Sequence, residues 1–302
     1  MRNLLLNILI FSFILPVSGQ DFLSESEEYN QSRTIGVTGF HALSWGGSIA
    51  GLQYIWYAGY EKSPFQFFDD SRQWNQMDKV GHFYAAYQIG RFSGDLYNWA
   101  GVNQRKSALI GSGFSFAYLT TVEILDGFNS NWGFSWSDVG SNAFGALSYY
   151  AQFRSEHDPY VHFKFSSSTS GLAQYRPNVL GNNFASRTLK DYNGQTYWVS
   201  FNPFYWFKSE SKIPKWIQLS IGYSTQDQLI GDGGTYIYNG GSEQISFSPY
   251  RQCFLSLDVD FESIPASSRL LKIVFRGLNM VKIPFPAVEI SQGQLTFRPL
   301  YF

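Results

Sequence analysis

The chain has 302 residues and a formal net charge of −1, which excludes the strongly basic surface expected of a nucleic-acid-binding protein. Only 15% of the residues are charged, whereas 19% are aromatic. A chain of this length has room for one or two domains with a large core. Because rings are abundant and charges are scarce, we expect contact with a membrane or envelope lipid.

Residues 1–19 have the pattern of a secretory signal peptide. Arg2 supplies the positive charge, LLLNILIFSFILPV is the apolar region, and small residues at 17–19 offer a cleavage site. The only cysteine is Cys253, so the sequence predicts neither an internal disulfide nor a lipid-attached cysteine at that site. We therefore expect an exported protein in the periplasm or outer membrane of a Gram-negative bacterium.

The first half of the mature chain predicts a helical domain. Residues 20–35 are polar and acidic and are expected to form an exposed lead-in, and the helical domain follows over 36–158. Asn75 is the expected N-cap of the second helix, and Ser135 or Ser137 that of the fourth. The apolar helices are predicted near 36–60, 77–99, 106–125 and from 135 or 137 to 153.

The second half, 159–302, is expected to be β-rich. His162 on the first of its strands, and Asp258 and Asp260 on a later one, are predicted to face solvent, and the Asn193-Gly194 pair predicts a hairpin turn. Alternating segments predict strands near 160–166, 196–207, 215–224, 250–261, 281–289 and 294–302, with an amphipathic helix near 267–280.

The predicted fold class is therefore α+β, with a bundle of about four apolar helices followed by an antiparallel β-rich half. The alternative is an outer-membrane β-barrel with a helical insert. This alternative rests on the alternating end LTFRPLYF, which places the aromatic Phe302 at the end of the chain, as in many barrels.

Three of the predicted helices each carry two polar side chains one turn apart, on otherwise apolar or small-residue faces. Positions three or four apart share a helix face, so each pair points in one direction. Buried polar groups of this kind need one another, water or a metal ion. The pairs are Asp78 with His82, Glu123 with Asp126, and Asp138 with Asn142, and Lys79 stands beside the first pair.

Three functions compete for this predicted polar centre. The leading hypothesis is structural: the side chains cross-link the helices of an exported, outer-membrane-associated envelope protein. The second is a metal-dependent enzyme acting on an envelope lipid or glycan, with His82, Glu123 and Asp138 as catalytic groups and Lys79 and Asn142 binding an anionic group. The third is an envelope binding or assembly module. The metal ligands under the second hypothesis are Asp78, His82, Glu123, Asp126 and Asp138, which suit a divalent cation.

The motifs DKVGHFYAAYQIGR, TTVEILDG and WSDVGSNAFGALSYY resemble an uncharacterised bacterial family of predicted periplasmic lipoproteins, the YfiM-like family. Tail segments such as KIPFPAVEI look like its longer members in Bacteroidetes-type bacteria. The order of Asp78-Lys79, His82, Glu123 and Asp138 is also similar to VanZ-like membrane proteins. This chain has Glu123-x-x-Asp126 where those proteins usually carry Glu-x-x-Gln. Neither resemblance implies an established reaction.

Overall fold

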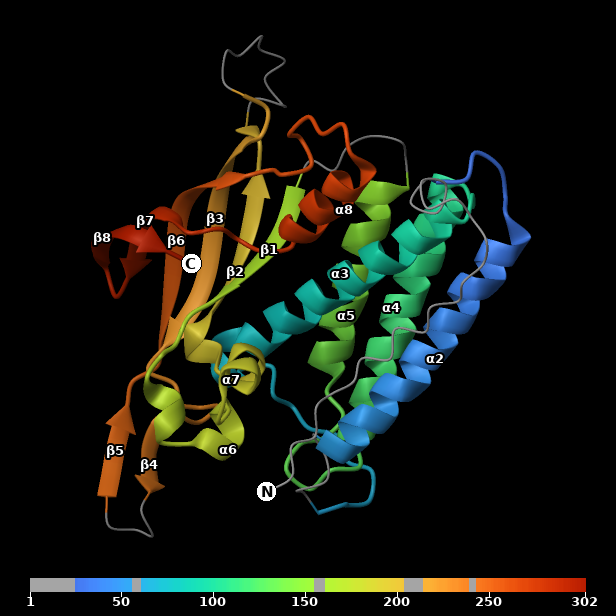
Figure 1. Ribbon diagram of the computed structural model, residues 1–302. Helices are drawn as coiled ribbons and strands as arrows, with labels where there is room; N and C mark the ends of the chain where they lie inside the picture. Colours follow the sequence, from blue (N-terminus) through green and yellow to red (C-terminus); the bar gives the residue numbers. More distant parts are fainter. Residues whose placement is uncertain (1–24, 56–60, 155–160, 204–213, 239–242) are drawn as a thin grey trace, which may run out of the picture.

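The computed structural model describes residues 25–55, 61–154, 161–203, 214–238 and 243–302. A helical bundle stands beside a twisted antiparallel sheet, and α3 lies between the two (Figure 1). This arrangement confirms the predicted α+β class, with helices in the first half and the sheet in the second. The predicted signal peptide at 1–19 lies outside the described residues.

The bundle consists of α2 (Gln31–Ile55), α3 (Met77–Trp99), α4 (Gln104–Asp126) and α5 (Trp136–Phe153). α3 packs against α4 and α5 at very short range, because glycines stand where the backbones cross. A Cβ on Gly111 would lie 2.3 Å from the Gly90 carbonyl oxygen, and one on Gly145 would lie 2.2 Å from the Phe83 carbonyl oxygen. The glycines therefore allow the backbones of these helices to pack closely. α2 begins at Gln31 rather than at 36, so the predicted lead-in is too long.

α4 is the one helix of the described residues that is long and apolar enough to cross a membrane, judged by length and composition alone. Such a test is also passed by core helices of soluble proteins. α4 packs against both α3 and α5 in the bundle.

The sheet contains six strands in the order β1-β2-β3-β6-β7-β8, and all neighbouring strands are antiparallel. β1 and β8 lie at its two ends, so the described strands form an open sheet and the barrel alternative is wrong. The strands are β1 (Val161–Ser167), β2 (Gln195–Phe201), β3 (Ile217–Gln226), β6 (Tyr250–Val259), β7 (Phe285–Ser291) and β8 (Gln294–Tyr301), and β4 (Gly234–Tyr238) pairs with β5 (Glu243–Phe247) separately.

Short helices fill the connections of the second half. α6 (Pro177–Leu180) and α7 (Phe184–Lys190) lie between β1 and β2, and α8 (Arg269–Leu278) lies between β6 and β7. A single 3-10 turn covers Tyr192–Gly194, so the predicted hairpin at Asn193-Gly194 is wrong. The side chain of Asn193 is buried, where it donates to the Gln228 carbonyl oxygen at 2.8 Å.

One face of the sheet is polar and buried, whereas the opposite face carries exposed apolar side chains. His162 is 2% exposed, and Lys164 forms a buried ion pair with Asp258 at 3.0 Å. Asp260 is buried too and lies 3.4 Å from His162 Nε2. The predictions that His162, Asp258 and Asp260 face solvent are therefore wrong, because alternation reveals two faces but not which of them the fold covers.

The segment before α3 also departs from the prediction. Asn75 does not cap the helix; its side-chain amide donates to Thr225 Oγ1 at 2.9 Å, and α3 begins at Met77. Trp74, Asn75 and Gln76 all have positive φ angles, between 49° and 62°. Non-glycine residues in this left-handed region cost backbone energy that the surrounding contacts must offset.

Candidate functional site

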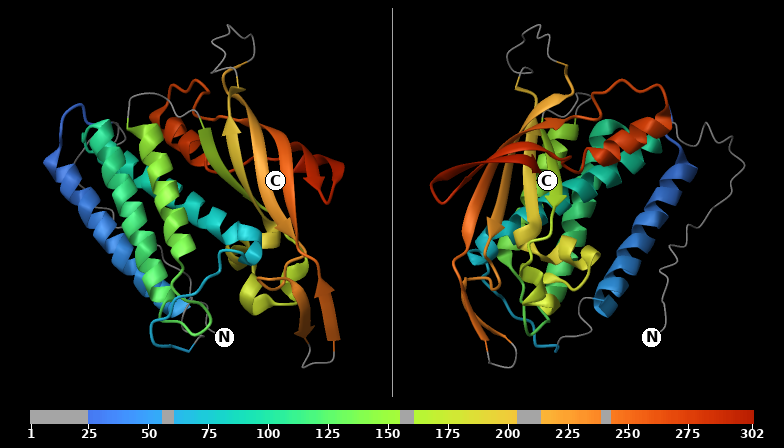
Figure 2. Two further views of the ribbon diagram at one scale, coloured as in Figure 1. Left: turned by 180° about the vertical axis from the view of Figure 1, so that it is seen from behind. Right: turned by 60° about the vertical axis from the view of Figure 1, so that its left-hand side comes forward.

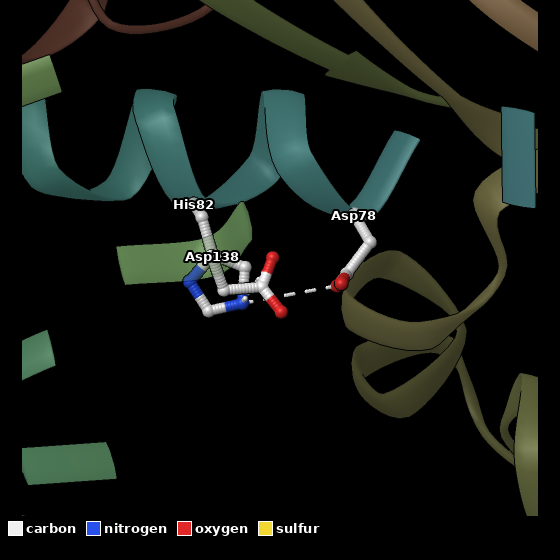
Figure 3. A group of neighbouring side chains, drawn as sticks. All are labelled: Asp78, His82 and Asp138. Atoms are coloured by element: carbon white, nitrogen blue, oxygen red, sulfur yellow. Dashed lines mark ion pairs between the residues drawn. The ribbon is translucent and has the colours of Figure 1, made fainter. Parts of the chain in front are cut away.

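The predicted polar side chains meet where three helix ends converge. Asp78 and His82 lie in the first turns of α3, Asp138 lies in the first turn of α5, and Glu123 lies in the last turn of α4. Figure 3 shows Asp78, His82 and Asp138 turned toward one another, with one possible ligand atom from each within 4.8 Å of the others. The fold thus brings together residues up to 60 positions apart in the chain.

Lys79 is the cation that holds this cluster together. Its Nζ lies 2.6 Å from Asp70 Oδ2, 2.9 Å from Asp78 Oδ2 and 2.7 Å from Asp138 Oδ1. An ammonium group has three N–H donors, and three carboxylates surround it here. The geometry therefore makes Lys79 a buried counter-ion of three carboxylates.

His82 lies at the centre of the cluster, and its two ring nitrogens have different surroundings. Nδ1 lies 3.1 Å from Asn142 Oδ1, and since a carbonyl oxygen can only accept, Nδ1 donates. In the neutral ring the lone pair is then on Nε2. That atom lies 3.5 Å from Glu123 Oε1, 3.8 Å from Asp138 Oδ1 and 3.9 Å from Asp78 Oδ1. These distances exceed those of a normal hydrogen bond.

Asn142 orients the histidine from α5 and is itself completely buried. Its Nδ2 atom has no hydrogen-bond partner among the described residues. A buried amide without a partner costs free energy and calls for a ligand, an ion or water nearby. Among the described residues, this donor of the cluster is left without an acceptor.

The sequence did not reveal two further members of the cluster, Tyr192 and Asp70. Tyr192, in the turn after α7, donates to Asp78 Oδ1 at 2.6 Å and so joins the β-rich half to the site. Asp70 accepts from Ser135 Oγ at 2.7 Å and from Ser137 Oγ at 3.1 Å. Ser135 also caps α5 by accepting from the Asp138 amide, which selects it over Ser137 as the N-cap. Only local capping signals were visible in the sequence; the pairings span 65 residues or more.

Two of the predicted ligands, Glu123 and Asp126, are not part of the group formed by Asp78, His82 and Asp138. Glu123 Oε1, however, lies 3.5 Å from His82 Nε2, whereas Asp126 is the last residue of α4. The negative charge of Asp126 is nevertheless one of those that raise the pKa of Glu123. Asp126 therefore contributes to the electrostatics of the site rather than to its centre.

The pKa values in the cluster are displaced in opposite directions. Burial raises the pKa of Glu123 to about 8, against the opposing charge of His82. Burial alone would lower the pKa of His82, but the charges of Asp78, Asp138 and Glu123 outweigh it and raise that pKa to about 9. Burial and then the Asp78 charge raise the pKa of Asp138. For Asp78, burial is outweighed by His82 and Lys79, and the pKa is lowered.

A different kind of site lies on the other side of the same helix. Val80, Phe83 and Tyr84 line an apolar groove of about 160 Å³ between α3 and the sheet, together with Phe163 and Tyr197 of the strands. On a helix these α3 positions lie opposite Asp78 and His82. Near its start, α3 thus presents an apolar face to the sheet and presents Asp78 and His82 to α4 and α5.

The comparisons with known proteins concern the segment that carries the cluster. Residues 66–153 match the model of a family described as predicted periplasmic lipoprotein (DUF2279). Comparisons with curated proteins and with solved structures gave no match. The likeness to VanZ-like membrane proteins is not supported. The matched segment contains every cluster residue named above except Tyr192, and it confirms the resemblance to predicted periplasmic lipoproteins, which agrees with an exported protein.

Proposed function

We propose that this exported envelope protein binds a divalent cation between α3, α4 and α5, with Asp78, His82 and Asp138 as ligands and Glu123 as a fourth. The observation that carries the proposal is the position of His82 Nε2. It faces three carboxylates at 3.5 to 3.9 Å but lies within hydrogen-bonding distance of none. Two ligands about 2.1 Å from a metal at a tetrahedral angle stand about 3.4 Å apart.

The charge balance supports the same conclusion. Among the described residues, the cluster sets four carboxylates, those of Asp70, Asp78, Glu123 and Asp138, against Lys79 and His82. Burial, and then the neighbouring carboxylates, raise the pKa values of Glu123 and Asp138, so the described side chains alone do not favour both groups as anions. A divalent cation would stabilise both carboxylates in the ionised form. One imidazole with several carboxylates suits Zn²⁺ or Mn²⁺.

The site is enclosed but not sealed. The side chains of His82 and Asp78 are 19% and 24% exposed, whereas Glu123 is 2% exposed. A cation entering from solvent would therefore meet Asp78 and His82 first. Asn142, bonded to the other ring nitrogen, would hold the imidazole in the metal-binding tautomer, as outer-shell partners of metal-bound histidines do.

A second candidate function is hydrolysis of an envelope lipid or glycan by the bound cation. The partial exposure of His82 and Asp78 favours it, because a catalytic metal needs a coordination position that water and substrate can reach. Mn²⁺-dependent cleavage of bis(p-nitrophenyl) phosphate or a p-nitrophenyl glycoside by the wild type, absent in Asp138→Asn, would support this extension. If the protein binds the cation but cleaves neither substrate, only the proposal of a cation site stands.

The test of the cation site is metal analysis of the purified full chain, followed by titration of chelator-treated protein with Zn²⁺ and Mn²⁺. We expect near-stoichiometric metal that is lost in His82→Ala, Glu123→Ala and Asp138→Asn. Asp69→Asn is the matched control, because Asp69 is an exposed carboxylate next to the cluster. A folded wild-type protein that neither carries metal nor binds Zn²⁺ or Mn²⁺ would overturn the proposal and leave a purely structural network.

A further inference from the structure

α8 is an amphipathic helix whose apolar side is exposed instead of being packed against the core. Its sequence, RLLKIVFRGL, places all its large aliphatic residues on one side and its three basic residues on the other. None of its residues is buried. The exposed aliphatic residues are Leu270 (60%), Leu271 (39%), Ile273 (51%), Val274 (46%) and Leu278 (37%).

The polar side of α8 faces the body of the protein. Arg276 forms an ion pair with Asp95 of α3 and another with Glu262 at 2.8 Å, and its guanidinium stands 5.7 Å from the centre of the Phe153 ring of α5. Directly after the helix, the buried Asn279 donates to Asp260 at 2.8 Å and to Glu262 at 2.9 Å. These contacts fix the rotation of α8 about its own axis.

Because the ion pairs of Arg276 hold the basic side of α8 against the protein, the aliphatic side of the helix faces outward. An amphipathic helix on a globular protein normally buries its apolar stripe against the core. Figures 1 and 2 show α8 at the outside of the molecule, beside the ends of α3 and α5. A contiguous exposed apolar stripe of this kind marks an interaction surface.

We infer that α8 lies in the headgroup region of an anionic lipid bilayer, with its aliphatic side in the acyl chains. The basic charge of α8 favours an anionic lipid surface as the partner of its apolar side. Residues 269–278 contain no acidic side chain. Helical spacing places the exposed Arg269 and Lys272 at the two edges of the basic side, on either side of Arg276, where they border the apolar stripe. A basic rim around an aliphatic face is the pattern of helices that lie in the membrane interface, where phosphate groups meet the basic side chains. This inference is independent of the cation site.

The test uses a local probe, because the apolar N-terminal sequence of the full chain could bind vesicles by itself. The exposed Cys253 is first replaced by Ser, and the environment-sensitive dye NBD is then attached at Leu270→Cys. Leu147→Cys on α5 is the matched control, since Leu147 and Leu270 are both 60% exposed. Vesicles of phosphatidylethanolamine and phosphatidylglycerol are compared with vesicles of phosphatidylcholine.

We expect a blue shift and increased emission at position 270 with the anionic vesicles and not at position 147. Lys272→Gln should weaken the apparent affinity measured at position 270 about fivefold, because each basic side chain near an anionic surface contributes about that factor. No shift at 270, or an equal shift at 147, overturns the inference. A shift at 270 that follows protein concentration without vesicles overturns it too, in favour of a second copy of the chain.

Discussion

Lys79 Nζ on α3 lies 2.7 Å from Asp138 Oδ1 on α5, and the two side chains are 10% and 5% exposed. This ion pair joins the ends of two helices within the cluster of polar side chains. Asp70 and Asp78 complete the shell around the ammonium group. Lys79 therefore links α5 and the segment before α3 to the start of α3.

Replacing Lys79 by Met should lower the free energy of unfolding by about 3 to 5 kcal/mol, because it leaves buried carboxylates without their cation. Urea unfolding of the metal-free protein measures the change. Lys62→Met is the control: Lys62 is exposed, and such substitutions usually stay within about 0.5 kcal/mol. Equal stability of the two variants would show that the ion pairs contribute little.

The metal-free protein should become less stable as the pH rises. The pKa of His82 is raised from 6.5 to about 9, so its contribution is fully present below pH 6.5 and is lost as the pH rises through 9. The pKa of Glu123 is raised from 4.5 to about 8, so its contribution has the same sign and is lost between these values. Unfolding at pH 6, 7.5 and 9 in chelator measures the slope, which His82→Gln should reduce between pH 6.5 and 9.

Cation binding should show the opposite pH dependence. A bound metal requires His82 to be neutral and Glu123 and Asp138 to be ionised, so binding releases protons. The apparent affinity for Zn²⁺ should therefore increase from pH 6 to pH 8. Calorimetry in two buffers of different ionisation enthalpy measures the number of protons released. Binding without proton release would be inconsistent with these residues as ligands.

Replacing Asn142 by Leu should weaken Zn²⁺ binding about 10- to 100-fold while the protein stays folded, because His82 loses the partner that orients its ring. The substitution removes the unpartnered Nδ2 but also leaves His82 Nδ1 without its acceptor, so we expect the metal-free protein to lose about 1 to 3 kcal/mol of stability. Ser141→Ala is the neighbouring control, since the Ser141 hydroxyl donates to the Ser137 carbonyl oxygen of its own helix. An unchanged affinity in Asn142→Leu would exclude this orienting role.

In the sheet, Lys164→Met should cost about 3 to 5 kcal/mol, because Asp258 would stay buried without its cation. Lys164→Met combined with Asp258→Leu should recover most of the loss, since apolar pairs replace buried ion pairs at little cost. Lys215→Met, at an exposed position, is the control. Thermal unfolding of these proteins, together with the single Asp258→Leu variant, measures the coupling, and additive losses would argue against a direct pair.

The sequence by itself determined the local elements and the composition of the site. α3 was predicted at Met77–Trp99, and it has these bounds. Asp78, His82, Asp138 and Asn142 were identified because helical spacing places each pair on one face. These features depend on residues within a turn or two of each other, so local periodicity and capping are sufficient to find them.

Only the tertiary structure decided which faces are covered and which distant groups meet. Tyr192 reaches Asp78 across 114 residues, and no local pattern could pair them. Strand alternation places His162 and Lys164 on one face of β1, but only the packing shows that this polar face is buried. In α8 the amphipathic pattern was predicted, yet the ion pair between Arg276 and Asp95 turned its apolar side outward. Periodicity defines two faces of an element, and long-range contacts determine which of them the protein buries.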